Sequence, residues 1–258
     1  MSDVPLLEVR GLTVRIGGQW VCRNLDLLVA PGERWGILGC NGVGKTTLLL
    51  TLAGIRPALV GEVWLRGERR DRLSRREAAR RLGLMPQDSA DLFPATVLEI
   101  ALAGRHPHLP PWQWETPEDG ALAYAALQAV GLEGFARRQV GSLSGGERRR
   151  LALAMLMTQD PSLWLLDEPT NHLDVAHQMQ AVELIATRIA RGGQGVLMTL
   201  HDINLAVRCC DRILLLFGDG ETAAGPTAQI LTEPALSRLY RHPVRSVMTE
   251  SGLLFYPT

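Results

Sequence analysis

Residues 39–46 read Gly-Cys-Asn-Gly-Val-Gly-Lys-Thr, which is the spacing G-x-x-x-x-G-K-[ST]. The short apolar stretch 34–38 precedes them as a buried strand would, and residues 46–53 follow as a helix closed by Gly54. In that context the glycines let backbone N–H groups point inward, and the helix N-terminus favours an anion. The sequence therefore predicts a nucleoside triphosphate site. The alternative is a plain glycine-rich turn before a helix.

The polar residues of this loop have separate expected roles. Lys45 would reach the β- and γ-phosphates of the nucleotide, and the Thr46 hydroxyl would hold Mg²⁺. A thiol at Cys40 would lie beside the phosphates, where we expect it to be open to alkylation. The other residues expected to contact the nucleotide are Gly39, Asn41, Gly42, Val43, Gly44 and Thr47.

Composition narrows the class of protein. Of the 258 residues 46% are hydrophobic, which is enough for a real core, and Lys+Arg and Asp+Glu both number 27. A neutral chain has no global field that would draw it to nucleic acid or anionic lipid. The four cysteines show no C-x-x-C spacing, no secretory signal is visible, and no apolar run is long enough to span a membrane. We therefore expect a soluble protein of the cytosol with free thiols.

Strand and helix patterns divide the chain. Short alternating strands before and after the glycine loop predict an antiparallel β arm, and strands separated by helices after residue 160 predict a parallel sheet. Between them the pattern is helical. We expect one α/β domain, residues 1–258, with a P-loop nucleoside triphosphatase core of the RecA-like type. Residues 1–87 and 161–258 would form the core and the β arm, and residues 88–160 a helical subdomain.

Two carboxylates end an apolar strand at residues 163–168, which read Leu-Trp-Leu-Leu-Asp-Glu. Phosphoryl transfer needs a carboxylate near Mg²⁺ and a group that orients the attacking water. Asp167 suits the first role. Glu168, which would face the other way from a strand, suits the second as general base. The alternative is a strand that simply ends at polar residues.

A pair of adjacent glycines lies within residues 143–147, Leu-Ser-Gly-Gly-Glu. Ser144 and Glu147 have capping-box spacing and predict a helix over residues 148–158. Gly145 and Gly146 would let an anion approach the first backbone N–H groups closely. The chain would then have two helix N-termini that can bind an anion. The alternative is that the N-terminus at residues 143–147 is an ordinary capped helix end.

Taken in order, these motifs resemble the nucleotide-binding subunits of ATP-binding cassette (ABC) transporters over nearly the whole chain. Residues 39–46 match the Walker A loop, residues 163–168 match Walker B, and residues 143–147 match the LSGGE-type signature. Residues 171–174, which end at Asp174, match the D-loop. Few other P-loop families carry the signature.

The resemblance implies further site residues. Gln87 stands where the family has a glutamine that contacts Mg²⁺ and water, and His201 where it has a histidine that contacts the γ-phosphate. Without the family, His201 reads as a satisfied histidine at a strand end. At the position of the adenine-stacking aromatic the chain has Ile16, so either Trp20 supplies the stacking face or Ile16 gives only apolar contact.

The resemblance also implies partners. Two copies would meet head to tail, so that Ser144, Gly145, Gly146 and Glu147 of one copy face the ATP held by Lys45 of the other. Residues 171–178 and 200–206 are similar to those of importer ATPases for iron–siderophore, haem or cobalamin complexes. We therefore expect a homodimer on membrane permease subunits at the cytoplasmic face of the inner membrane. A substrate-binding protein would act indirectly, and no nucleic acid would be bound.

The expected permease contact is segment 88–105, with Leu92 and Phe93 as apolar anchors. Two other functions remain open. A soluble ABC-type ATPase that acts on nucleic acid or ribosomes usually has tandem cassettes or long coiled coils, which this chain lacks. A P-loop kinase for a small molecule would not need residues 143–147.

Overall fold

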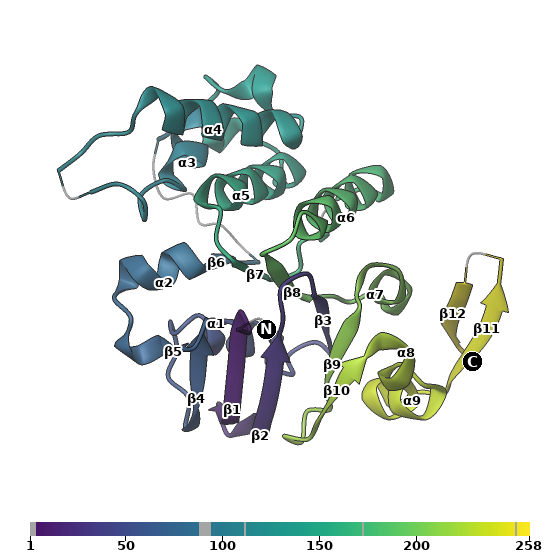
Figure 1. The fold of residues 1–258 in the computed structure, drawn as a ribbon. Coiled ribbons are helices and arrows are strands. Elements are labelled where there is room, and N and C mark those ends of the chain that lie inside the picture. Colours follow the sequence, from purple (N-terminus) through teal and green to yellow (C-terminus); the bar gives the residue numbers. More distant parts are fainter. Residues whose placement is uncertain (1–3, 88–93, 111, 172, 251) are drawn as a thin grey trace.

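The computed structural model describes residues 4–87, 94–110, 112–171, 173–250 and 252–258 (Figure 1). At its centre is a six-stranded sheet in the order β10-β9-β3-β8-β7-β6, parallel except for β10. These strands are β3 (Arg34–Leu38), β6 (Leu82–Met85), β7 (Leu163–Leu166), β8 (Gly195–Thr199), β9 (Arg212–Leu216) and β10 (Thr222–Pro226). Parallel strands covered on both faces read as apolar runs, which explains the buried sequences of β7, β8 and β9.

The antiparallel arm is confirmed as a four-stranded sheet in the order β2-β1-β4-β5. Its strands are β1 (Leu7–Ile16), β2 (Gln19–Val29), β4 (Val60–Leu65) and β5 (Glu68–Arg69). The apolar face of the arm, α1 (Lys45–Leu52) and one face of the central sheet together form one of two core clusters. Burial alternates along β1 because one face of the arm is core and the other is solvent.

The helical insert begins after β6 and lies above the sheet in Figure 1. Its helices are α3 (Val97–Ala103), α4 (Pro117–Ala129) and α5 (Gly145–Gln159), and α2 (Arg75–Arg81) precedes β6. The capping box expected at Ser144 and Glu147 is present, and Thr96 and Thr116 open α3 and α4 in the same way. The expected permease anchors Leu92 and Phe93 lie outside the described residues.

The remaining elements follow β7. They are α6 (Val175–Ala190), α7 (Ile203–Cys209), α8 (Thr227–Ile230), α9 (Glu233–Tyr240), β11 (Val244–Thr249) and β12 (Gly252–Pro257). Short 3₁₀ turns lie at Arg70–Arg72, Glu133–Phe135 and Val140–Ser142. Strands β11 and β12 form a separate antiparallel hairpin at the C-terminal end, which the sequence pattern did not predict. Among the described residues no helix is both long and apolar enough to cross a membrane.

Candidate nucleotide site

The phosphate loop joins β3 to α1 and leaves the start of that helix without a side-chain cap. Gly44 is the N-cap residue, with φ 104°, and Gly42 has φ 75°, so both positions favour glycine. Helices α2, α3, α4 and α5 instead begin with a Ser or Thr hydroxyl that accepts a backbone N–H. The first turn of α1 therefore keeps its N–H groups for an anion supplied from outside the chain.

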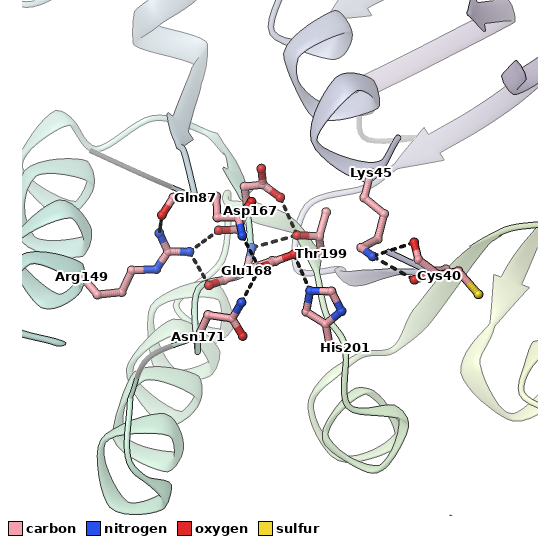
Figure 2. A network of polar contacts seen from close by, with 10 residues as sticks. Cys40, Lys45, Gln87, Arg149, Asp167, Glu168, Asn171, Thr199 and His201 are labelled. Carbon is pink, nitrogen blue, oxygen red and sulfur yellow. Dashed lines mark hydrogen bonds and ion pairs between the residues drawn. The ribbon is translucent and has the colours of Figure 1, made fainter. Parts of the chain in front are cut away.

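Lys45 is held inside this loop. Its side chain is only 6% exposed, and its Nζ donates to the carbonyl oxygens of Gly39 at 2.8 Å and Cys40 at 3.3 Å (Figure 2). Burial lowers the pKa of Lys45, because the charged ammonium loses hydration there. An ammonium has three donors, so a phosphate oxygen would restore favourable contacts to a cation that is poorly hydrated.

The thiol of Cys40 does not lie where we expected it. Its Sγ donates to the carbonyl oxygen of Leu239 in α9 at 3.1 Å, and in Figure 2 the sulfur points away from Lys45. The expectation of a thiol beside the phosphates is therefore wrong for this structure. Val43 is likewise turned into the core, 4% exposed. Both residues serve the loop through their backbone and packing.

The two carboxylates follow the end of β7 and are fixed by a hydroxyl from β8. Thr199 is fully buried, and its Oγ1 donates to Asp167 Oδ1 at 2.7 Å and accepts the backbone N–H of Glu168 at 2.8 Å. Glu168 has φ 52°, a left-handed conformation that is rare outside glycine. The two side chains are thus separated by a turn of the backbone, and the strand alternation expected for Glu168 does not apply.

Glu168 is the centre of a polar network (Figure 2). Its Oε2 accepts from Gln87 Nε2 at 2.9 Å and from the side-chain amide of Asn171, and its Oε1 pairs with His201 Nε2. The carboxylate is 8% exposed in this network. Three segments that are far apart in the sequence, at Gln87, residues 168–171 and His201, therefore meet at one carboxylate. This carboxylate lies at the carboxyl edge of the parallel sheet, where open α/β sheets bind their ligands.

A cavity of about 490 Å³ joins the phosphate loop to this network. It is lined by Ile16, Asn41, Gly42, Gly44, Lys45, Thr46, Thr47, Gln87, Glu168, Asn171 and His201. Of the two candidates for the adenine contact, Ile16 is on the wall. Trp20 is not among the lining residues, and its ring packs against the guanidinium groups of Arg15 and Arg23 at 4.8 and 4.4 Å.

The signature residues lie apart from this cavity. Ser144 and Gly145 are exposed at the start of α5, and among the described residues none of positions 144–147 lines the cavity. The backbone N–H of Ser144 lowers the pKa of Glu147, which closes the capping box. Asp174 caps α6 by accepting the backbone N–H of His177 at 2.8 Å.

The sequence predicted no individual role for three residues of the site. Asn171 stands inside the stretch matched to the D-loop, without a role of its own. Thr199 is hidden in the apolar run of β8. Arg149 lies in the run Arg148-Arg149-Arg150 and donates to the backbone of the two segments that carry Gln87 and Glu168. Helical spacing from Leu153 would have placed Arg149 on the inner face of α5.

Comparisons with known proteins identify the family of the chain. Residues 22–171 match the ABC transporter family model. The chain is 36% identical to the ferric enterobactin transport ATP-binding protein FepC of Escherichia coli, over 93% of this chain and 88% of that protein. It is 40% identical to the hemin import ATP-binding protein HmuV of Myxococcus xanthus, over 91% and 89%.

A solved structure gives the same result for the fold. It is an inward-facing conformation of a putative metal-chelate type ABC transporter, with a TM-score of 0.85 and 28% identity, and the match covers 98% of each chain. The family model matches more than half of the chain, and both relatives are more than 30% identical to it over most of their length. The chain belongs to the family of ATP-binding subunits of ABC transporters, and it is an ATPase.

Proposed function

We propose that this ATPase powers the import of a metal chelate, either a ferric siderophore, haem or cobalamin, through a membrane permease. The relatives named for ferric enterobactin and hemin support this cargo class. The observation that carries the hydrolytic role is the Glu168 carboxylate, held by Gln87 and His201 on the wall of the cavity that contains Lys45.

Glu168 is the general base in this proposal. Its carboxylate lies on the cavity wall, where it can accept the proton of a water that attacks the γ-phosphate. Lys45 neutralises charge that develops on the phosphate oxygens, and His201 holds one carboxylate oxygen and faces the same space. Gln87 and Asn171 hold the other oxygen, which fixes the direction of the base.

The donor set fits Mg²⁺. Asp167 is 1% exposed, and its Oδ2 has no hydrogen-bond partner among the described residues, which a metal-bound water would supply. The Thr46 hydroxyl and the Gln87 amide lie on the same cavity wall, and oxygen donors of this kind suit a hard cation. Bound with the phosphates, Mg²⁺ would withdraw charge from the transferred group. Thr46, Gln87 and Asp167 are the residues that would hold it.

The exposed residues at the start of α5 support a homodimer. Ser144, Gly145 and Gly146 lie apart from the cavity of their own chain, so in this proposal they serve the ATP of a second copy. Substituting Ser144 by Arg should then abolish ATP hydrolysis while one chain still binds nucleotide. Hydrolysis at the wild-type rate in Ser144→Arg would contradict the dimer.

We place the dimer on permease subunits at the cytoplasmic face of the membrane, with a substrate-binding protein acting indirectly. The test is affinity capture of the tagged chain from detergent-solubilised native membranes, followed by identification of its partners. The complex is then reconstituted in liposomes and assayed for ATP-dependent uptake of a ferric siderophore, haem and cobalamin.

Recovery of a many-helix permease, with uptake of one of the three chelates, would support the proposal. Recovery of nucleic acid or ribosomes in place of a permease would favour the soluble ATPase that acts on them. Phosphate transfer that requires an added small acceptor would favour a kinase.

A further inference from the structure

Arg149 connects the signature helix to both catalytic segments of the site. Its side chain extends from α5 and is 7% exposed. Its Nη1 donates to the carbonyl oxygens of Pro86 at 2.8 Å and Gln87 at 2.7 Å. Its Nη2 donates to the carbonyl oxygens of Asp167 and Glu168 (Figure 2). One guanidinium thus donates to four backbone carbonyl oxygens, two consecutive ones on each of two chain segments.

These acceptors continue the pairing of two neighbouring strands. Strands β6 and β7 are parallel, and the last bond between them joins the Asp167 N–H to the Met85 carbonyl at 2.9 Å. Arg149 bridges the two segments beyond that bond, so the backbones that carry Gln87 and Glu168 keep a fixed separation.

The backbone of Glu168 shows why such a bridge is needed. A non-glycine residue at φ 52° persists only where its surroundings hold it. Here the N–H of Glu168 is bound by Thr199, and its carbonyl oxygen is bound by Arg149. Both peptide groups of the proposed base are therefore held, one from the sheet and one from the helical insert.

We propose that Arg149 is a positioning residue, which sets the Glu168 carboxylate and the Gln87 segment for hydrolysis and ties both to the signature helix. The inference rests on the proposed role of Glu168 as general base. Ser144 begins the same helix five residues earlier, about 7.5 Å along its axis. A displacement of the signature end of α5 is therefore transmitted to the backbone of the base through about one and a half helical turns.

Only arginine can make this set of bonds. Its planar guanidinium presents donors in a rigid fork, whereas lysine has one nitrogen on a flexible stem. Glutamine keeps a planar donor but loses the charge, the length and two of the donor directions.

Arg150 provides a matched control on the same helix. Its Nη1 also donates to two backbone carbonyls, those of Val130 at 2.9 Å and Gly131 at 3.3 Å, and both belong to the helical insert. Substituting Arg150 removes a comparable pair of bonds without touching the catalytic segments. Comparing the effects of the two substitutions separates the positioning of Gln87 and Glu168 from a general contribution to stability.

The experiment compares wild type, Arg149→Gln, Arg149→Lys and Arg150→Gln in the complete transporter complex. The measurements are kcat for ATP hydrolysis, Kd for a fluorescent ATP analogue and Tm. We expect Arg149→Gln to lower kcat at least tenfold, with Kd within about threefold of wild type. Arg149→Lys should recover part of kcat, and Arg150→Gln should keep the wild-type kcat.

A kcat for Arg149→Gln within twofold of wild type would overturn the inference. A parallel loss of kcat, ATP affinity and Tm in the Arg149 and Arg150 variants would also overturn it, because that is the result of a purely structural role. If Arg149→Gln does not fold, the same comparison is made with Arg149→Lys, which should lower kcat while the Kd stays close to that of the wild type. A wild-type complex that hydrolyses no ATP would instead contradict the proposed function.

Discussion

Gly44 offers a quantitative test of the phosphate-loop geometry. The substitution Gly44→Ala would place a Cβ 2.5 Å from Val21 Cγ2, in a residue whose φ is 104°. The backbone strain is worth about 1–3 kcal/mol, and overpacking against a fully buried valine adds about 1–3 kcal/mol. The free energy of unfolding should therefore fall by about 2–6 kcal/mol.

Gly42 is the matched control, since it also has positive φ but a Cβ there meets nothing within 4 Å. Gly42→Ala should lower the free energy of unfolding by only about 1–2 kcal/mol. The assay is urea denaturation of both variants, together with Val21→Ala and the Gly44→Ala/Val21→Ala double variant. The double-mutant cycle should show a favourable coupling of about 1–3 kcal/mol. Equal losses at the two glycines with no coupling to Val21 would refute the packing argument.

Three further outcomes follow from the site. Thr199→Val should lower the free energy of unfolding by about 2 kcal/mol or more relative to Thr199→Ser, because a buried carboxylate oxygen and an N–H lose their partner; equal denaturation midpoints would contradict this. Ile16→Ala should raise the Kd for ATP about three- to tenfold through lost apolar contact, while Trp20→Ala should leave the Kd unchanged. The reverse result in a nucleotide titration would contradict the assignment of Ile16 as the adenine contact. The pKa of Glu147 lies below its ordinary value of 4.5, so its carboxylate stabilises the fold above that pH and the contribution is lost as pH falls through the lowered pKa. The Tm difference between wild type and Glu147→Ala should accordingly shrink below pH 4.5, and a difference that grows there would exclude the cap.

Features that depend on residues close together in the sequence could be predicted. The glycine loop, the apolar strands and the capping box at Ser144 depend on local spacing, and the structure confirms them. The parallel sheet and antiparallel arm follow from the order of such elements. The C-terminal hairpin was missed because β11 is largely exposed and its apolar and polar residues do not alternate, unlike those of a half-buried strand.

Features that depend on tertiary register could not be predicted. Helical spacing from Leu153 places Arg149 on the inner face of α5, but the backbone carbonyls that its side chain reaches depend on how α5 lies against the sheet. The left-handed turn at Glu168 requires a partner for its N–H in β8, 31 residues later. The choice between Ile16 and Trp20 depends on the end of the β1–β2 hairpin, where Arg15 pairs with Trp20 and Ile16 with Gln19.

The central claim, that Glu168 is the base of an ATPase built on this cavity, is tested most directly by the substitution Glu168→Gln. Glutamine preserves the shape of the side chain but cannot accept a proton from water at neutral pH. We predict that Glu168→Gln lowers kcat at least a hundredfold, in the range that general-base catalysis contributes. The Kd for ATP should stay within a few-fold of wild type. Hydrolysis by Glu168→Gln at the wild-type rate would contradict the account.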